Sequence, residues 1–178
     1  MRRRLLIIIV LLIIGLSIFI VTGYSDLSKA ESNTTNKFEK IRPQLDTRYE
    51  KLFEALSLAE KIGGKRDVTT EGLKAYKNYK NAINTKNTMK ELDASIELEN
   101  IIGRLRTNTT NVKLSGSQEL KDAIALIDAS VVSKDVKDAY NNAAKSYEEK
   151  RTSWRYLLSA TVFGFSANKT LQFSEPSL

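Results

Sequence analysis

The sequence predicts an all-α fold, with an N-terminal transmembrane helix followed by an antiparallel bundle of about four long helices. Three observations carry this prediction. An apolar run that no charge interrupts opens the chain, and beyond it apolar residues recur in steps of three and four. No stretch of useful length alternates between apolar and polar residues, and only two prolines and eight glycines punctuate the chain.

The N-terminal anchor is predicted over residues 1–22. Three arginines precede an apolar run from Leu5 to Val21, and only Gly15 and Ser17 interrupt its surface of large apolar side chains. About 18 helical residues rise roughly 27 Å, close to the hydrocarbon thickness of a bilayer. This segment is therefore expected to contact the lipid bilayer. Its length and the lack of an A-x-A-like triplet after it favour an uncleaved anchor over a cleaved signal peptide.

Charge asymmetry predicts the orientation of the chain in the membrane. The three arginines lie before the span, whereas the first charges after it, on Asp26, Lys29 and Glu31, are mixed in sign. By the positive-inside rule the N-terminus stays cytoplasmic and residues 23–178 are extracytoplasmic. The predicted location is a cell membrane that the chain crosses once.

Composition excludes several kinds of chemistry. The chain has no Cys and no His, so disulfides, thiol redox chemistry and a Ser-His-Asp triad are excluded, and the commonest zinc ligands are missing. Without the three N-terminal arginines, 25 basic residues stand against 21 acidic ones and are interspersed with them, so nucleic acid is not expected as a partner. No cofactor and no metal are expected.

The first helix of the domain is expected to run on from the anchor to Ile62, where Gly63 and Gly64 end it. A second stretch of helical spacing covers residues 67–105. Within it, residues 78–90 are weakly apolar and rich in Asn, Lys and Thr, which predicts a break.

The stretch 107–117 is turn-forming and separates this part from the next helix. Ser115 and Gln118 have the spacing of a capping box. Four apolar residues of the third helix are expected to point inward: Leu120, Ile124, Ile127 and Val131.

The apolar phase slips at residues 132–135, which predicts either a bulge or a short break with Ser133 as a new N-cap before the final helical stripe. This stripe runs through Val136, Tyr140, Ala143 or Ala144, Tyr147, Trp154, Leu158 and Val162. Because Trp154 stands seven residues after Tyr147 and four before Leu158, it is expected to be buried in the core.

The run YNNAAKSYEEKRTSWRYLLSATVFGF, residues 140–165, resembles the closing signature of the LemA family. That signature has a YN pair, a second aromatic residue seven positions on, an aromatic-Pro pair and an Ala-x-x-Phe-Gly-Phe segment. Glu148 stands where the family has a second Asn, and Arg155 where it has Pro. Eight residues match the pattern without a gap: Tyr140, Asn141, Tyr147, Trp154, Ala160, Phe163, Gly164 and Phe165.

The resemblance implies a membrane-anchored bundle of long helices, over residues 23–178, with no established enzymatic activity. The sequence therefore predicts a scaffold or interaction protein of the bacterial cell envelope, which binds another envelope protein or a second copy of itself. The alternative is an extracytoplasmic ligand-binding or sensory bundle. A sensor must pass its signal across the membrane, and only about four residues precede the span, so this alternative requires a separate signalling partner.

The eight matching residues are expected to serve packing or interaction rather than catalysis. Gly164 is expected to cap the last helix so that Phe163 and Phe165 fold back over the bundle, although the same residues could form a docking hook for a partner. Two carboxylate pairs, Glu50 with Glu54 and Glu97 with Glu99, are the candidates for a catalytic pair inside the bundle, but a di-metal site would also need His, and Glu50 and Glu54 are expected on a solvated face. Three triplets match the N-glycosylation sequon, at Asn33, Asn108 and Asn168.

Overall fold

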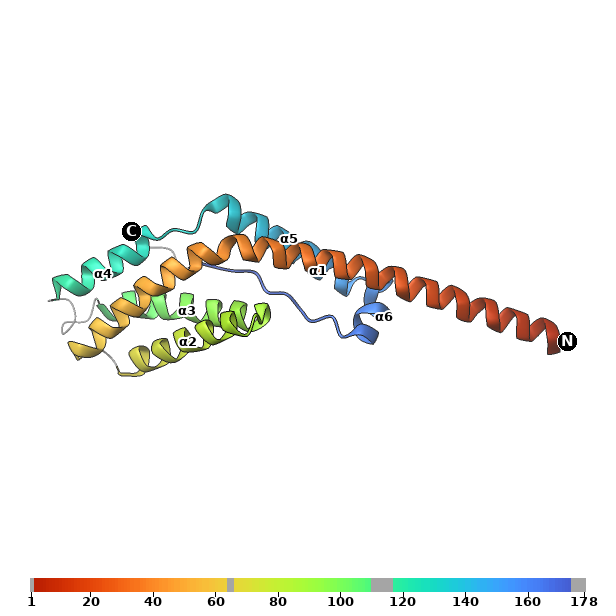
Figure 1. Cartoon of the computed structure of the whole chain (residues 1–178), viewed down its shortest axis with the longest axis horizontal. Coiled ribbons are helices and arrows are strands. Elements are labelled where there is room, and N and C mark those ends of the chain that lie inside the picture. Colours follow the sequence, from red (N-terminus) through yellow and green to blue (C-terminus); the bar gives the residue numbers. More distant parts are fainter. Residues whose placement is uncertain (1, 64–65, 110–116, 174–178) are drawn as a thin grey trace. The chain divides into compact units, whose positions relative to one another are not determined.

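The computed structural model describes residues 2–63, 66–109 and 117–173 of the 178-residue chain (Figure 1). These residues contain no strand, which confirms the all-α prediction. The helices that they form are α1 (Arg2–Lys61), α2 (Arg66–Asn84), α3 (Thr88–Thr109), α4 (Gln118–Ala129), α5 (Lys134–Thr152) and α6 (Trp154–Phe163). Apart from α1, with 60 residues, they have 10 to 22 residues and are shorter than the long helices that the sequence predicts.

The chain divides into two compact units. The terminal unit comprises Met1–Lys37 and Ala139–Thr170, and the central unit comprises Phe38–Asp138 and Leu171–Leu178. Helix α1 begins in the terminal unit and ends in the central unit.

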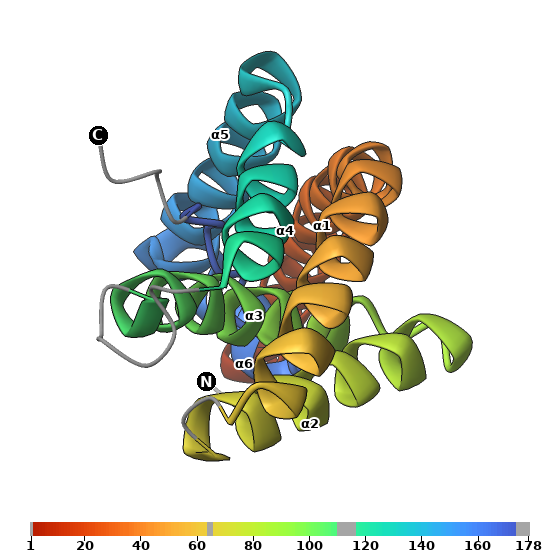
Figure 2. The ribbon, with the colours of Figure 1, turned by 90° about the vertical axis from the view of Figure 1, so that its left-hand side faces the viewer.

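The central unit has an apolar core that follows the predicted helical spacing. α2 and α3 pack against each other (Figure 2). They run antiparallel, because Arg104 near the end of α3 forms ion pairs with Asp67 and Glu71 at the start of α2. Helix α1 contributes fully or nearly fully buried side chains to this core: Phe38, Ile41, Leu45, Tyr49, Leu52, Leu56 and Ala59.

Two ion pairs, one of them wholly buried, tie α1 to α3 in the central unit. Arg48 donates from Nε to Glu99 Oε1 at 2.8 Å and from Nη2 to Oε2 at 3.1 Å, and both side chains are almost wholly buried. Arg48 Nη1 also donates to the carbonyl oxygen of Ile127 at 2.7 Å, near the end of α4. Arg42 pairs with the buried Glu91 in the same bidentate manner. Glu99, one of the candidate catalytic carboxylates, is therefore buried and held in an ion pair.

Most helix ends agree with the predicted turn signals. Gly63 has a φ of 82°, which supports the predicted end of α1, while Gly64 lies outside the described residues. The break predicted within 78–90 is confirmed between α2 and α3, where Lys86 has a φ of 52° and Asn87 Oδ1 accepts from the amide of Lys90.

The start and end of α4 differ from the prediction. Ser117 is its N-cap and accepts from the amide of Leu120 at 3.3 Å, whereas the predicted capping residue, Ser115, lies outside the described residues. Leu120 and Ile127 are buried as predicted, but Val131 is 72% exposed. Because α4 ends at Ala129, Val131 no longer shares its apolar face.

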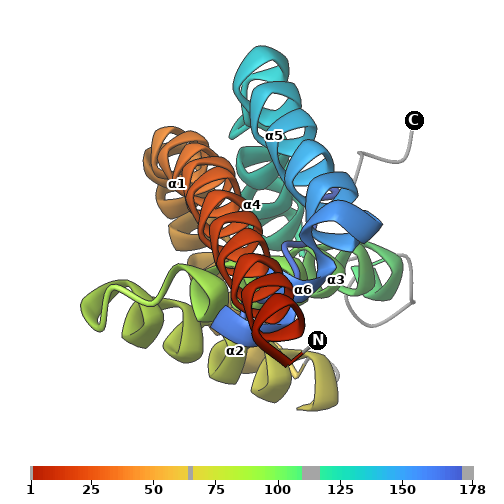
Figure 3. The same ribbon diagram turned by 90° about the vertical axis from the view of Figure 1, so that its right-hand side faces the viewer.

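In the terminal unit, α5 lies beside α1 (Figures 1 and 3). Leu27 of α1, Tyr147 of α5 and Ala160 of α6 form its buried cluster, with Ala30, Tyr156 and Phe165 packed around them. This cluster begins two turns beyond the apolar run of α1.

Candidate interaction surface

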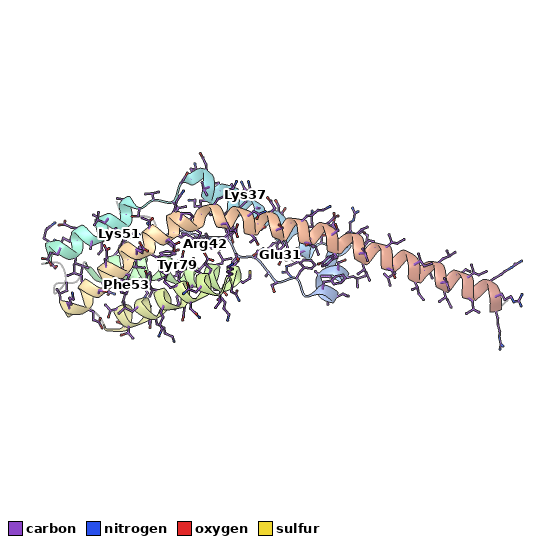
Figure 4. All side chains as sticks on the ribbon, in the orientation of Figure 1. Glu31, Lys37, Arg42, Lys51, Phe53 and Tyr79 are labelled. Atoms are coloured by element: carbon purple, nitrogen blue, oxygen red, sulfur yellow. The ribbon has the colours of Figure 1, made fainter. Side chains whose placement is uncertain are left out.

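The apolar segment of α1 is exposed over most of its length, and α6 reaches it only near its end, at Ile20. One helix among the described residues, α1, is long and apolar enough to cross a membrane, and none of its most apolar 18-residue window is buried. Figure 4 shows the side chains of this segment projecting outward from the helix. Its polar side chains bond to the helix backbone, since Ser17 Oγ donates to the Ile13 carbonyl at 2.8 Å and Thr22 Oγ1 to the Ile18 carbonyl at 2.9 Å. Such bonds meet the requirement that polar groups be satisfied internally in hydrocarbon.

Two of the motif tyrosines hold the extended segment that follows α6. Tyr140 Oη donates to the Lys169 carbonyl at 2.6 Å, and Tyr147 Oη donates to the Ser166 carbonyl at 2.8 Å. Glu148, which stands where the family has Asn, accepts from the amide of Asn168 at 2.5 Å. Tyr140 and Tyr147 lie two turns apart on α5 and Glu148 directly follows Tyr147, so that one side of α5 fixes the chain after α6.

The tyrosine hydroxyls are held in their neutral form. Burial, helped by the neighbouring carboxylate of Glu31, raises the pKa of Tyr147 to about 12. Burial also raises the pKa of Tyr140 well above its ordinary range. Both residues are therefore neutral hydrogen-bond donors at any physiological pH, which favours a structural role for them over acid-base chemistry.

Helix α6 approaches α1 closely at Gly23. A Cβ atom on Gly23 would stand 2.2 Å from Ser159 Oγ and 3.0 Å from Ser159 Cβ, so a larger residue here would displace α6. Ser159 Oγ donates to the Ile20 carbonyl at 2.9 Å, and Tyr156 Oη donates to Asp26 Oδ2 at 3.1 Å. The sequence analysis did not single out Gly23 or Ser159, although their small size was a signal of close helix packing.

The end of α6 confirms the predicted glycine cap. Gly164 has a φ of 68°, and its amide and that of Phe165 both donate to the Ala160 carbonyl. Phe163 and Phe165 then contact the ring of Tyr24, with centroid distances of 4.6 and 5.7 Å. Phe165 folds back onto the cluster as predicted, while Phe163 stays 46% exposed.

The prediction that Trp154 is a buried core residue is wrong, because its side chain is 82% exposed. The prediction assumed one unbroken helix from Tyr147 to Leu158. Instead α5 ends at Thr152, and Ser153 takes an extended conformation with φ −70° and ψ 145°. The helical phase is therefore reset, and Leu158, predicted to share the buried stripe, is 49% exposed.

The remaining motif residues are divided between core and surface. Ala160 is buried, and Asn141 is half-buried on α5. The structure brings Tyr147, Ala160 and Phe165 together in one cluster and leaves Trp154 outside it. An exposed apolar surface results on α6, formed by Trp154, Leu157, Leu158 and Val162.

Two further candidates from the sequence do not form a site. Glu50 and Glu54 are exposed and pair with Lys80 and Lys51, and Glu97 is also exposed. Among the described residues no group of three or more His, Cys, Asp or Glu is placed to hold a metal ion.

The sequons differ in their exposure. Asn33 is exposed and Asn168 half-buried, whereas Asn108 is buried beside a groove of about 560 Å³ in the central unit.

The walls of this groove include Arg104, which pairs with Glu71, and Glu99, which pairs with Arg48, so the charges of these two residues are already matched within the protein.

Comparisons of the chain with protein-family models, with curated proteins and with solved structures found no match.

Proposed function

We propose that this protein is a membrane-anchored scaffold or interaction protein of the bacterial cell envelope, with the build of the LemA family. Residues 5–21 would cross the bilayer once, with the N-terminus in the cytoplasm. The helical domain at residues 23–178 would form an antiparallel bundle of helices. It would present its surfaces to another envelope protein or to a second copy of the chain.

The observation that carries this proposal is the bare apolar segment of α1. Most of the large apolar side chains in this segment are about half exposed or more, for example those of Leu6, Leu12 and Ile18. A water-exposed surface of that size would cause aggregation, whereas in a bilayer it is solvated by lipid. The same helix continues without interruption into the packed domain, so that the domain is held directly by the anchor.

The motif tyrosines have a structural task that fits the proposed scaffold. Their hydroxyls fix the segment that follows α6, which gives the YN pair and the second aromatic residue a structural task. A task of this kind suits a scaffold, because it rigidifies the fold and needs no bound ligand.

Membrane integration of the full chain tests the proposal. We expect the wild type to stay in the membrane pellet after alkaline carbonate extraction and to float with vesicles in a density gradient. Ile9→Arg/Ile13→Arg, which places two charges within the span, should release the chain, because each central arginine opposes insertion by about 2.5 to 3.5 kcal/mol. Leu6→Ala/Ile18→Ala, which shortens side chains near the ends of the span, serves as the matched control and should stay integrated.

Protease added to intact spheroplasts tests the orientation, and it should digest the domain. Extraction of the wild type by carbonate would contradict the anchor, while protection of the domain until lysis would reverse the topology. Site-specific crosslinking between two differently tagged copies of the chain then separates self-association from binding to another protein.

A further inference from the structure

We propose that α6 is an interfacial helix, which lies in the headgroup region of the membrane that α1 spans and places Trp154, Leu157, Leu158 and Val162 in contact with lipid. This inference rests on the membrane anchoring proposed above. It assigns a second lipid contact to the chain, separate from the span.

The two faces of α6 carry the first step of the argument. Ser159 and Ala160 are buried, and Tyr156 is half-buried toward α1. The opposite face has the i, i+3, i+4, i+8 spacing of an apolar stripe, yet Trp154, Leu157, Leu158 and Val162 are 82%, 54%, 49% and 62% exposed. A short helix that is apolar on both faces and covered on only one requires an apolar surrounding for the other.

The position of α6 along α1 identifies that surrounding. Ser159 Oγ bonds to the carbonyl of Ile20, the penultimate residue of the apolar run, and Gly23 lies against Ser159 and Tyr156. The exposed stripe is thus level with the end of the segment that crosses the bilayer. Val21, the last residue of the run, is itself 61% exposed, so that lipid around the end of the span is the apolar surrounding nearest to α6.

The direction of α6 agrees with a helix that lies in the membrane plane. Tyr156 at its start contacts Gly23 and Asp26, and Phe163 at its end contacts Tyr24. From Tyr156 to Phe163, seven residues along α6, the contacted residue of α1 changes only from Asp26 to Tyr24. Helix α6 therefore crosses α1 and does not run along it. A helix in the interface must cross a spanning helix in this manner.

The side chains around the stripe are those of a membrane interface. Trp and Tyr are enriched at headgroup level, and Arg and Lys extend their charges toward lipid phosphates. The exposed Arg155 and the half-buried Lys150 lie over the ring of Tyr156, with their charged groups 5.5 and 5.8 Å from its centroid. Helix α6 itself contains no acidic residue. A second copy of the chain is the rival occupant of this face, and the experiment separates the two.

Trp154 is the only tryptophan in the chain and reports its own surroundings. The full-length protein is reconstituted in vesicles of phosphatidylcholine and phosphatidylglycerol, in matched preparations with and without bromine on the acyl chains near the headgroup. We expect blue-shifted emission that loses most of its intensity in brominated vesicles and resists iodide in the buffer. This result should not change when the protein is diluted with lipid.

Trp154→Phe/Asn142→Trp is the matched control probe. Asn142 is exposed on α5 and adjoins Ala143, which shares a groove with Asn33 of α1. Asn33 lies about 20 Å along the helix from Ile20, since each residue adds 1.5 Å. Emission from residue 142 should be red-shifted, quenched by iodide and insensitive to bromine.

Three outcomes would overturn the inference. Emission from Trp154 that iodide quenches and bromine does not, in protein that floats with the vesicles, would place α6 in water and leave the anchor intact. Blue-shifted emission that bromine does not quench and that reverts on dilution with lipid would assign the face to a second copy. Protein that fails to float with the vesicles would contradict the anchor and this inference together.

Discussion

In the central unit the buried polar side chains include the pair of Arg48 with Glu99 and the carboxylate of Glu91, whereas in the terminal unit the described buried polar side chains are uncharged. Arg48 and Glu99 are 4% and 3% exposed and bond to each other at two points. In the terminal unit the buried hydrogen-bonding groups are hydroxyls. Those of Tyr140, Tyr147 and Ser159 each donate to a backbone carbonyl.

The difference shows how helices of one chain adapt to two surroundings. A buried charge is tolerated only where its partner and further hydrogen bonds offset the loss of water, and this loss grows as the surroundings become less polar. Neutral hydroxyl groups lose far less on burial. The terminal unit adjoins the apolar span, and its described fully buried polar side chains are all of this kind, while its ion pair of Arg151 with Glu148 is only half-buried. The central unit instead joins α1 to α3 through the fully buried pair of Arg48 with Glu99.

Removal of Arg48 should have the largest effect. Arg48→Met takes the cation away from the buried Glu99 carboxylate, and breaking a buried pair in this way typically costs about 3 to 5 kcal/mol. Denaturant unfolding of the detergent-solubilised chain, followed by circular dichroism, measures it. Lys51→Met is the control, because Lys51 pairs with the exposed Glu54 and such pairs contribute roughly 0 to 1 kcal/mol.

The double variant Arg48→Met/Glu99→Met sharpens this test. With both charges replaced by apolar side chains, much of the lost stability should return, because no unpaired charge stays buried. Equal unfolding free energies for Arg48→Met and Lys51→Met would show that the central unit does not depend on its buried pair.

A larger side chain at Gly23 should disrupt the terminal unit. Gly23→Val forces a branched side chain into the space of Ser159, and overpacking of this kind costs about 1 to 3 kcal/mol. Gly15→Val is the matched control within the same helix, since nothing lies within 4 Å of a Cβ there. Limited proteolysis near Ser153 measures the release of α6, and equal cleavage of the two variants would count against the close packing.

Tyr147 should make the terminal unit sensitive to alkaline pH. Its pKa of about 12 exceeds the ordinary value of roughly 10, so the folded state holds the phenolic proton more tightly than the unfolded state. This contribution is complete below about pH 10 and is lost as pH rises through the pKa of the folded state. Tyr147→Phe should lower stability by about 1 kcal/mol at neutral pH and reduce the decline above pH 10.

Unfolding experiments between neutral and strongly alkaline pH check this expectation. Tyr24→Phe is the control, because its ring is 44% exposed and keeps its contacts with Phe163 and Phe165. An identical alkaline decline in wild type and Tyr147→Phe would show that the buried hydroxyl does not govern it.

Local patterns in the sequence predicted most of the secondary structure. The ends of α1 and α2 follow from Gly63 and from the polar stretch after Asn78, because such residues act within a single turn. The buried state of Glu99 was not predictable in this way. Its partner Arg48 lies 51 residues away, and only the packing of α3 against α1 brings them together.

The candidate surface on α6 was predicted only in part. Gly164 was recognised as a cap from its place between two phenylalanines near the end of an apolar run, and the structure confirms it. The direction of Trp154 was missed because Thr152 and Ser153 are weak helix breakers, so the periodicity was extended through them. Since α6 is apolar on both faces, its sequence alone does not indicate which face packs on α1.

Truncation of Trp154 should have the smallest effect on folding. An 82% exposed side chain leaves no cavity when it is removed, so Trp154→Ala should change the unfolding free energy in detergent by less than about 0.5 kcal/mol. Tyr147→Ala, at another aromatic residue of the predicted stripe, should cost about 3 kcal/mol or more, because that side chain is fully buried. Thermal unfolding followed by circular dichroism compares the two. A large loss for Trp154→Ala would mean that α5 and α6 form one continuous helix with Trp154 in its core, and it would remove the exposed face on which the lipid contact of α6 depends.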